Sequence, residues 1–401
     1  MRVVPERESG ESLEVRMKVH KKRSRSRAAA LLVGIALVTA ACGGGDDSSA
    51  PAPAPAPAPT DQAPAAPEVE PAEITLIIAS AVALPKEEVA IYAVPEALGF
   101  FEEEQLTVSI EFADGGTAAT QAVASGSGDI TASGLNIGFS AAERGIPIKS
   151  VGGLVINWPW RFATLPDSSL TDCSGLQGST IGIISLASGS YPYARAFVSE
   201  CGLDPDADVN YVPTGIGAPA YAALESGQVD ALALYTAAYA AIENTGIEFG
   251  YLENPEFFDP LVSISWLAGT ELIENRPDVL ERFLRAAYKG LLYSNANPEK
   301  AVLLGYEVLP GLLQGETPDA RLALDVNSLA TWLASTAPAG PVESWTSLGY
   351  FSTEQLFASM SLALTSGNIS VAFPPEQAYD DSLLDAANDF DFAEIVALAR
   401  S

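Results

Sequence analysis

Three short turns in the sequence combine small residues with an expected helix start, an arrangement that can bind a polar ligand. Free backbone N–H groups and the helix dipole attract partial or full negative charge at such a start. The alternative is ordinary turn chemistry and helix capping. The candidate ligand-binding residues from these turns are Gly115, Gly116, Thr117, Ser133, Asn136, Ser188, Gly189 and Ser190.

Aromatic residues form a second candidate set, because rings in a cleft can stack on a planar ligand. Trp158 and Trp160 lie in the sequence NWPWR, Tyr191 follows the Ser-Gly-Ser turn with Tyr193 two residues further on, and Tyr235 ends an apolar run. Hinge packing is the alternative role for the two tryptophans.

Two arginines are candidates for an anion-binding role, since a bidentate Arg suits an anionic ligand. Arg161 could instead complete a salt bridge, and Arg195 could face solvent or pair with Glu200 or another acid. The formal net charge of −30 disfavours anions and excludes nucleic acid as a partner. We therefore favour a neutral or planar heterocyclic ligand over a sulfonate.

The N-terminal segment predicts export and lipid attachment. Basic residues 17–27 precede the apolar run 28–41, which is too short to span a bilayer and is typical of a signal peptide. Cys42 follows Thr-Ala-Ala, which resembles a lipobox; an ordinary signal peptide is the alternative. Residues 43–72, with alternating Pro and Ala, predict a semi-rigid tether. We expect residues 1–41 to be removed, with Met17 as an alternative start, and the lipid on Cys42 to hold the protein at the outer face of the cytoplasmic membrane.

Histidine and cysteine usage narrows the chemistry. The single histidine, His20, falls inside the expected signal peptide. The mature chain would then lack Ser-His-Asp and Cys-His catalysis and a His-ligated zinc site, so we expect no enzyme activity, no metal and no cofactor. Cys173 precedes an expected strand, and Cys201 ends the helix after it. A helix that packs back on its strand returns the chain to the same edge of the sheet, which favours a disulfide over two buried thiols.

Strand and helix patterns alternate from about residue 73 and would position these candidates. The last expected strand is 261–269, and the pattern from Glu271 onward is almost wholly helical. This order predicts an α/β fold with mainly parallel sheets flanked by helices, and its length predicts two domains. The other expected strands are 74–79, 106–112, 129–133, 151–158, 180–185, 209–214 and 231–235.

The order of several motifs resembles a known family. The segment VPEALGFFEEEQLTVSIEFADGGTAATQAVASGSGDIT, followed by GLQGSTIGIISLASGS, ALESGQVDALALY and RPDVLERFLRAAYKGLLYSNANPEKAVLL, is similar to periplasmic solute-binding proteins for sulfonates, taurine, nitrate and thiamine-pyrimidine precursors. The resemblance implies a two-lobed type II binding-protein fold with a hinge of crossing strands. Lobe 1 would comprise residues 73–154 and 268–401, and lobe 2 would comprise residues 155–267. It places NWPWR at the crossing between lobes.

The resemblance implies a monomeric, lipid-anchored binding protein that hands a small molecule to an ABC permease and ATPase. A binding module for a membrane sensor is an alternative. A second alternative is an enzyme like the thiamine-pyrimidine synthases of this fold, which use a histidine and a cysteine-rich motif that the expected mature chain lacks.

Overall fold

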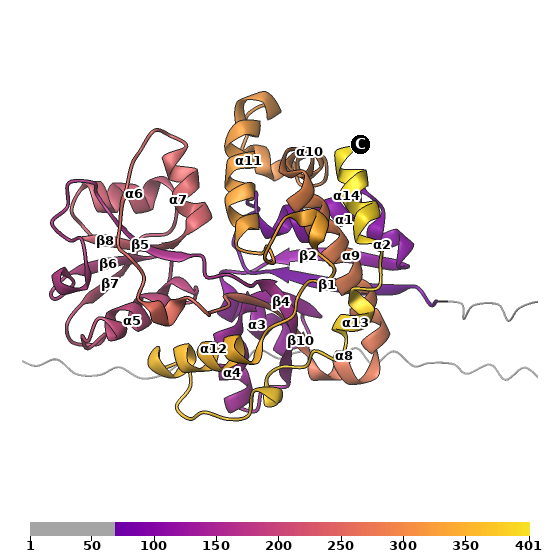
Figure 1. Cartoon of the computed structure of the whole chain (residues 1–401), viewed down its shortest axis with the longest axis horizontal. Coiled ribbons are helices and arrows are strands. Elements are labelled where there is room, and N and C mark those ends of the chain that lie inside the picture. Colours follow the sequence, from indigo (N-terminus) through magenta and orange to yellow (C-terminus); the bar gives the residue numbers. More distant parts are fainter. Residues whose placement is uncertain (1–68) are drawn as a thin grey trace, which may run out of the picture. The chain divides into compact units, whose positions relative to one another are not determined.

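The computed structural model describes residues 69–401, which are built around two five-stranded sheets (Figure 1). The expected signal peptide, Cys42 and the tether up to residue 68 lie outside the described residues. Both sheets are mixed: four strands of each run in one direction, and one strand runs antiparallel to both of its neighbours. The α/β class predicted from the sequence is confirmed.

The first sheet has the strand order β2-β1-β3-β10-β4. Strands β1, β2 and β3 are parallel, whereas β10 is antiparallel to both of its neighbours. The register of β1 on β2 runs from Ala72 opposite Leu106 to Ile78 opposite Phe112. The bounds are β1 (Ala72–Ile78), β2 (Leu106–Phe112), β3 (Ile130–Gly134), β4 (Ile148–Val155) and β10 (Ile264–Gly269).

The second sheet has the strand order β7-β6-β8-β5-β9. Strand β6 is parallel to β7 and β8, and β5 is antiparallel to β8 and β9. Strands β5 and β9 were not expected from the sequence. The bounds are β5 (Trp160–Thr164), β6 (Thr180–Ile183), β7 (Asn210–Pro213), β8 (Ala231–Tyr235) and β9 (Gly250–Tyr251).

Each sheet has its own apolar core, as expected when helices cover both faces of a sheet. The first core surrounds Trp266 and Phe283, and the second surrounds Phe162 and Phe197. A further cluster under α6 and α7 covers the opposite face of the second sheet. We call each sheet with its helices a lobe. The boundaries at 154/155 and 267/268 stay a prediction, although β10 already joins the first sheet at Ile264.

The helices divide between the two lobes. A π-helical turn (Val89–Ala93) continues directly into α1 (Val94–Ala97). Helices α5 (Ser190–Glu200), α6 (Ala218–Glu225) and α7 (Thr236–Glu243) flank the second sheet (Figure 1). The remaining helices are α2 (Phe100–Glu103), α3 (Gly116–Ala124), α4 (Leu135–Glu143), α8 (Thr270–Asn275), α9 (Pro277–Ala296), α10 (Pro298–Val308), α11 (Pro318–Ala334), α12 (Thr353–Thr365), α13 (Leu384–Ala387) and α14 (Phe392–Arg400).

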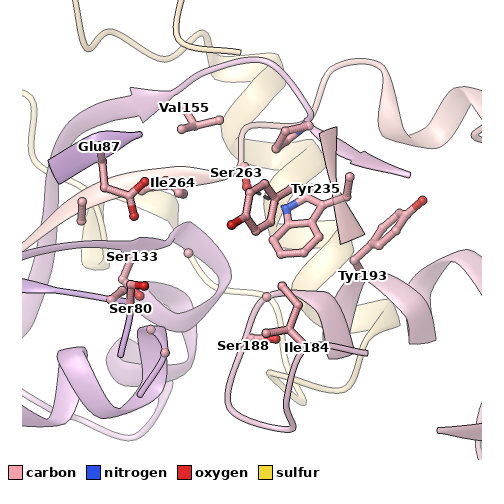
Figure 2. Close-up of a pocket in the computed structure, with 18 of the residues that line it drawn as sticks. Ser80, Glu87, Ser133, Val155, Ile184, Ser188, Tyr193, Tyr235, Ser263 and Ile264 are labelled. Carbon is pink, nitrogen blue, oxygen red and sulfur yellow. Dashed lines mark hydrogen bonds between the residues drawn. The ribbon is translucent and has the colours of Figure 1, made fainter. Parts of the chain in front are cut away.

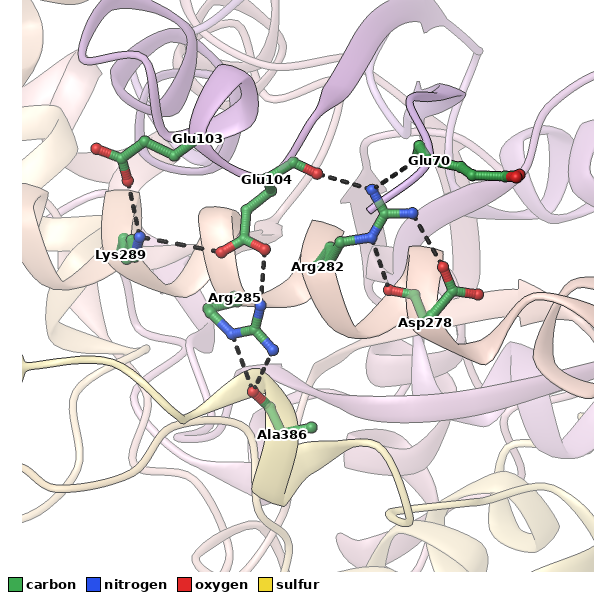
Figure 3. Close-up of polar contacts among 8 residues, drawn as sticks. All are labelled: Glu70, Glu103, Glu104, Asp278, Arg282, Arg285, Lys289 and Ala386. Atoms are coloured by element: carbon green, nitrogen blue, oxygen red, sulfur yellow. Dashed lines mark hydrogen bonds and ion pairs between the residues drawn. The ribbon is translucent and has the colours of Figure 1, made fainter. Parts of the chain in front are cut away.

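Helix α9 is the longest of these helices, and its basic residues fasten the first lobe together (Figure 3). Arg282 donates to the backbone oxygens of Glu70 and Glu104. Arg285 pairs with the Glu104 carboxylate at 2.6 Å and donates to the Ala386 oxygen. These groups are mostly shielded from water, which strengthens the contacts between them. Through these contacts, α9 is joined to the chain before β1, to the end of α2 and to the α13 region.

Candidate functional site

A cavity of about 340 Å³ lies between the two lobes. The segments that follow β1, β3, β6 and β8 line it, so it sits beyond the carboxyl ends of parallel strands from both sheets. This is where open α/β sheets bind ligands. Trp332 of α11 and Leu362 of α12 complete the lining.

The cavity brings together most of the ligand-binding residues expected from the sequence. The remaining four, Thr117, Arg161, Ser190 and Tyr191, do not line it. The nine that do are Gly115, Gly116, Ser133, Asn136, Trp158, Trp160, Ser188, Gly189 and Tyr235.

Two of the four residues outside the cavity border a second pocket beside it. Thr117 Oγ1 donates to the Ala187 backbone oxygen at 3.3 Å and so links the two lobes. Tyr191 stacks edge-on against Tyr211 and lies under the Arg195 guanidinium. These contacts join α3 and α5 to neighbouring segments, so they explain Thr117 and Tyr191 without a ligand.

The other two have structural contacts of their own. Ser190 is fully buried, and its Oγ accepts a hydrogen bond from the Ile184 backbone N–H at 2.9 Å. The exposed Arg161 places its guanidinium 5.2 Å from the ring centroid of Tyr251. These contacts account for Ser190 and Arg161 without a ligand.

Arg195 pairs with an acid, one of the alternatives raised by the sequence. Its Nη2 donates to Asp206 Oδ2 at 2.9 Å, and the contact raises the pKa of Arg195. Its Nε donates to the Ser366 backbone oxygen at 3.2 Å, which adds a second link between the lobes. The guanidinium of Arg195, which lines the second pocket, is therefore already hydrogen-bonded within the protein.

An aromatic wall, which we define as Trp158, Trp160, Tyr193 and Tyr235, forms one side of the cavity. Trp160 lies edge-on to Tyr235 with centroids 5.6 Å apart, and Trp158 lies edge-on to Tyr193 at 5.8 Å. Trp160 Nε1 donates to Ser263 Oγ at 2.9 Å, which fixes its ring. Figure 2 shows Tyr235 and Tyr193 on the side of the cavity opposite Glu87.

Tyr193 was noted beside the Ser-Gly-Ser turn, two residues after Tyr191, but was not placed in the set of residues expected to bind ligand. Its hydroxyl donates to Asn254 Oδ1 at 2.8 Å, and Asn254 Nδ2 donates to the Trp160 backbone oxygen at 2.9 Å. The wall is thus held by hydrogen bonds on its far side. The helical spacing could have identified Tyr193. Side chains two residues apart on α5 point in different directions, so only one of Tyr191 and Tyr193 can face the cavity.

Two glycines allow close approach at the cavity. A Cβ on Gly116 would lie 2.4 Å from Ser133 Oγ, and a Cβ on Gly189 would lie 2.9 Å from Trp160 Cζ2. The small-residue turns found in the sequence therefore make room for side chains of β3 and β5 that line the cavity.

Charged residues at the cavity were also missed from the sequence. Lys86, Glu87 and Asp114 line it. Lys86 Nζ contacts Glu87 Oε1 and lies 3.5 Å from Glu88 Oε1. Burial raises the pKa of Glu88 to about 8. Burial alone would lower the pKa of Lys86, but the two carboxylates outweigh it and raise this pKa.

The two cysteines expected to pair are joined in the structure, with Cys173 and Cys201 in a disulfide that packs beside the core of the second lobe. Between residues 69 and 401, no cluster of three or more His, Cys, Asp or Glu residues could hold a metal ion. The same part of the chain contains no helix long and apolar enough to cross a membrane.

Two lobes of this topology, with a cavity between them at the strand ends, define a two-lobed solute-binding protein. Two solved structures share the fold. A Bordetella bronchiseptica protein has a TM-score of 0.61 and 18% identity, and the match covers 79% of this chain and 97% of that protein. The Escherichia coli aliphatic sulphonate binding protein SsuA has a TM-score of 0.59 and 17% identity, and the match covers 77% of this chain and 92% of SsuA. Residues 86–301 match the family model described as NMT1/THI5 like, and the chain belongs to this family.

Two curated relatives are binding proteins for ring compounds. The riboflavin-binding protein RibY of Chloroflexus aurantiacus is 27% identical over 276 residues, which cover 67% of this chain and 76% of RibY. The formylaminopyrimidine-binding protein of Halalkalibacterium halodurans is 26% identical over 210 residues, or 51% of this chain and 62% of that protein. Fold and relatives make this chain a small-molecule-binding protein of the kind that serves ABC importers.

Proposed function

We propose that this chain captures an uncharged, planar heterocycle between its two lobes and delivers it to the permease and ATPase of an ABC importer. The observation that carries the proposal is the aromatic wall facing a mainly apolar cavity. Aromatic rings that are already held in place stack on a planar ligand with little loss of conformational freedom. The two relatives named for riboflavin and formylaminopyrimidine support the same ligand class.

Lobe closure is the mechanism that we propose for capture. A ligand in the cavity would touch β3 and α3 of the first lobe and β5, β8 and α5 of the second. The closed state then gains contacts that an open state lacks, and the population shifts toward closure. The links from Thr117 to Ala187 and from Arg195 to Ser366 would break when the lobes separate.

A thermal-shift panel on the purified protein tests the ligand class. The panel contains riboflavin, aminopyrimidines, taurine, alkylsulfonates and nitrate. A ligand present at about 100 times its dissociation constant adds about 2.7 kcal/mol of stability, which raises the melting temperature visibly. We expect a ring compound to give the shift. A shift from a sulfonate alone would contradict the proposal.

Transport, rather than sensing or catalysis, is the role that we propose for the bound state. The relatives are named as binding proteins, and the only histidine of the sequence, His20, falls within the expected signal peptide. Copurification of a permease and an ATPase with the membrane-bound protein is the expected result. Recovery of a sensor protein in their place, or conversion of the bound compound into a product, would contradict it.

We also propose that a lipid on Cys42 anchors the protein outside the cytoplasmic membrane. The support is the sequence around Cys42, where small residues precede the cysteine and a Pro/Ala-rich segment follows it. The native protein should partition into the detergent phase of a phase-separation assay, and Cys42→Ala should move it to the aqueous phase. Equal partitioning of the two forms would refute the anchor.

A further inference from the structure

Glu87 is a buried carboxylate on the cavity side opposite the aromatic wall. It is 5% exposed and lies at the start of the helix that leads into α1. Its Oε1 contacts Lys86 Nζ, whereas its Oε2 has no hydrogen-bond partner. Figure 2 shows the carboxylate pointing into the cavity. The carboxylate is therefore directed toward the cavity, and one of its oxygens is buried without a partner from the protein.

An unpartnered buried carboxylate oxygen is costly, because it loses its water hydrogen bonds and gains none from the protein. Other lining atoms are in the same condition. Ser133 Oγ, Ser359 Oγ and Trp158 Nε1 are buried and have no hydrogen-bond partner. A polar ligand that filled the cavity would satisfy atoms that the protein itself leaves unsatisfied. Of these atoms, Glu87 Oε2 is the one that can only accept.

The charges around the cavity oppose an anionic ligand. Among the described residues, Lys86 is the only basic residue that lines it, and its ammonium group already contacts the Glu87 carboxylate. Asp114 adds a further carboxylate to the lining. A sulfonate would approach the free oxygen of Glu87 without an uncommitted cation to offset the repulsion.

We propose that Glu87 Oε2 accepts a hydrogen bond from an N–H group of the bound heterocycle and so selects rings that carry an imide, amide or amino N–H over anions. The contact uses a charged acceptor in a site shielded from water, where such a hydrogen bond is stronger than a neutral one. This specificity role rests on the proposed function, since it requires a ring ligand between the lobes.

Riboflavin and its N3-methyl derivative test the contact without changing the protein. The derivative replaces the imide N–H of the ring with a methyl group and keeps the aromatic system. Titration calorimetry on the purified wild-type protein should show at least tenfold weaker binding of the methylated compound. Aminopyrimidine and its N,N-dimethyl derivative form a second pair, for a cavity that accepts only the smaller ring.

Glu87→Gln keeps the shape of the side chain and removes its charge. We expect it to weaken binding of the N–H compound at least tenfold and to reduce the discrimination against the methylated compound. Glu96→Gln is the matched control, since it makes the same charge change at an exposed position of α1 and should leave affinity unchanged.

The outcomes separate the two proposals. Tight binding of a ring compound that is insensitive both to N-methylation and to Glu87→Gln would overturn the role of Glu87 and leave the proposed function standing. Failure of the wild-type protein to bind any ring compound, with binding of taurine or an alkylsulfonate, would overturn both. A Glu87→Gln protein that does not fold leaves the methylation result to decide.

Discussion

Replacing Gly189 with alanine tests whether the missing side chain at this turn positions the aromatic wall. Gly189 has a φ of −62°, so its backbone accepts alanine without strain. The new Cβ would lie 2.9 Å from Trp160 Cζ2, whereas ordinary contacts begin at 3.4 Å. The indole edge must therefore move by about 0.5 Å to regain a normal contact.

The surroundings of Trp160 make this displacement costly. Its Nε1 is hydrogen-bonded to Ser263, and its ring packs edge-on against Tyr235. Overpacking of this kind costs about 1–3 kcal/mol. If the ligand stacks on the displaced ring, part of this cost appears in binding, and about 1.4 kcal/mol corresponds to a tenfold change in the dissociation constant. We expect Gly189→Ala to weaken binding of the ring compound roughly tenfold.

Titration calorimetry with the best ring compound from the panel measures the effect, and Gly269→Ala is the control. Gly269 has a φ of −66°, and no atom lies within 4 Å of the position that a Cβ would take there, so alanine should change nothing. Tryptophan fluorescence of Gly189→Ala should also differ from that of the wild type. Unchanged affinity together with an unchanged emission spectrum would refute the placement of Trp160 against Gly189 at the binding site.

Three further predictions concern stability. The disulfide closes a separation of 28 residues, so replacing both Cys173 and Cys201 with serine should cost about 3–4 kcal/mol in urea unfolding and remove the effect of a reductant. Burial raises the pKa of Glu88 to about 8, so the folded protein keeps a proton that the unfolded chain releases. The free energy of unfolding should therefore fall as the pH rises from about 5 to 8. Glu88→Gln should flatten this pH profile in urea unfolding. Glu104→Gln deprives Arg285 of its anionic partner and should lower the unfolding free energy by about 1.5–3 kcal/mol, and no change in urea unfolding would mean that water replaces the pair.

The strand pattern of the fold could be read from the sequence because most strands are apolar runs bounded by turn residues. Strand β2 has the bounds that were expected, and β8 matches as well. Strand β5 was missed because it follows Pro159 directly and contains an exposed charge. Its antiparallel pairing with β8 depends on how the chain crosses between lobes, which local periodicity does not encode.

The missed strand explains why Arg161 was placed at the cleft. Side chains alternate between the faces of a strand, and on β5 the buried Trp160 and Phe162 flank an exposed Arg161. Once Trp160 faces the cavity, Arg161 must point to the other side. Identifying 160–164 as a strand would have excluded the arginine from the binding set by the same argument that retains the tryptophan.

The arrangement of polar groups in the cavity could not be predicted from the sequence. Small-residue turns mark the starts of α3 and α5, and these helix starts favour ligand atoms with negative partial charge. Glu87 presents the opposite preference, and its importance lies in one oxygen left without a partner by tertiary packing. A ring that carries both carbonyl oxygens and an N–H group satisfies the two preferences together, whereas a sulfonate satisfies only the first. Neither the helix starts nor Glu87 decides the ligand class alone, but the presence of both at one cavity favours a ring compound over a sulfonate.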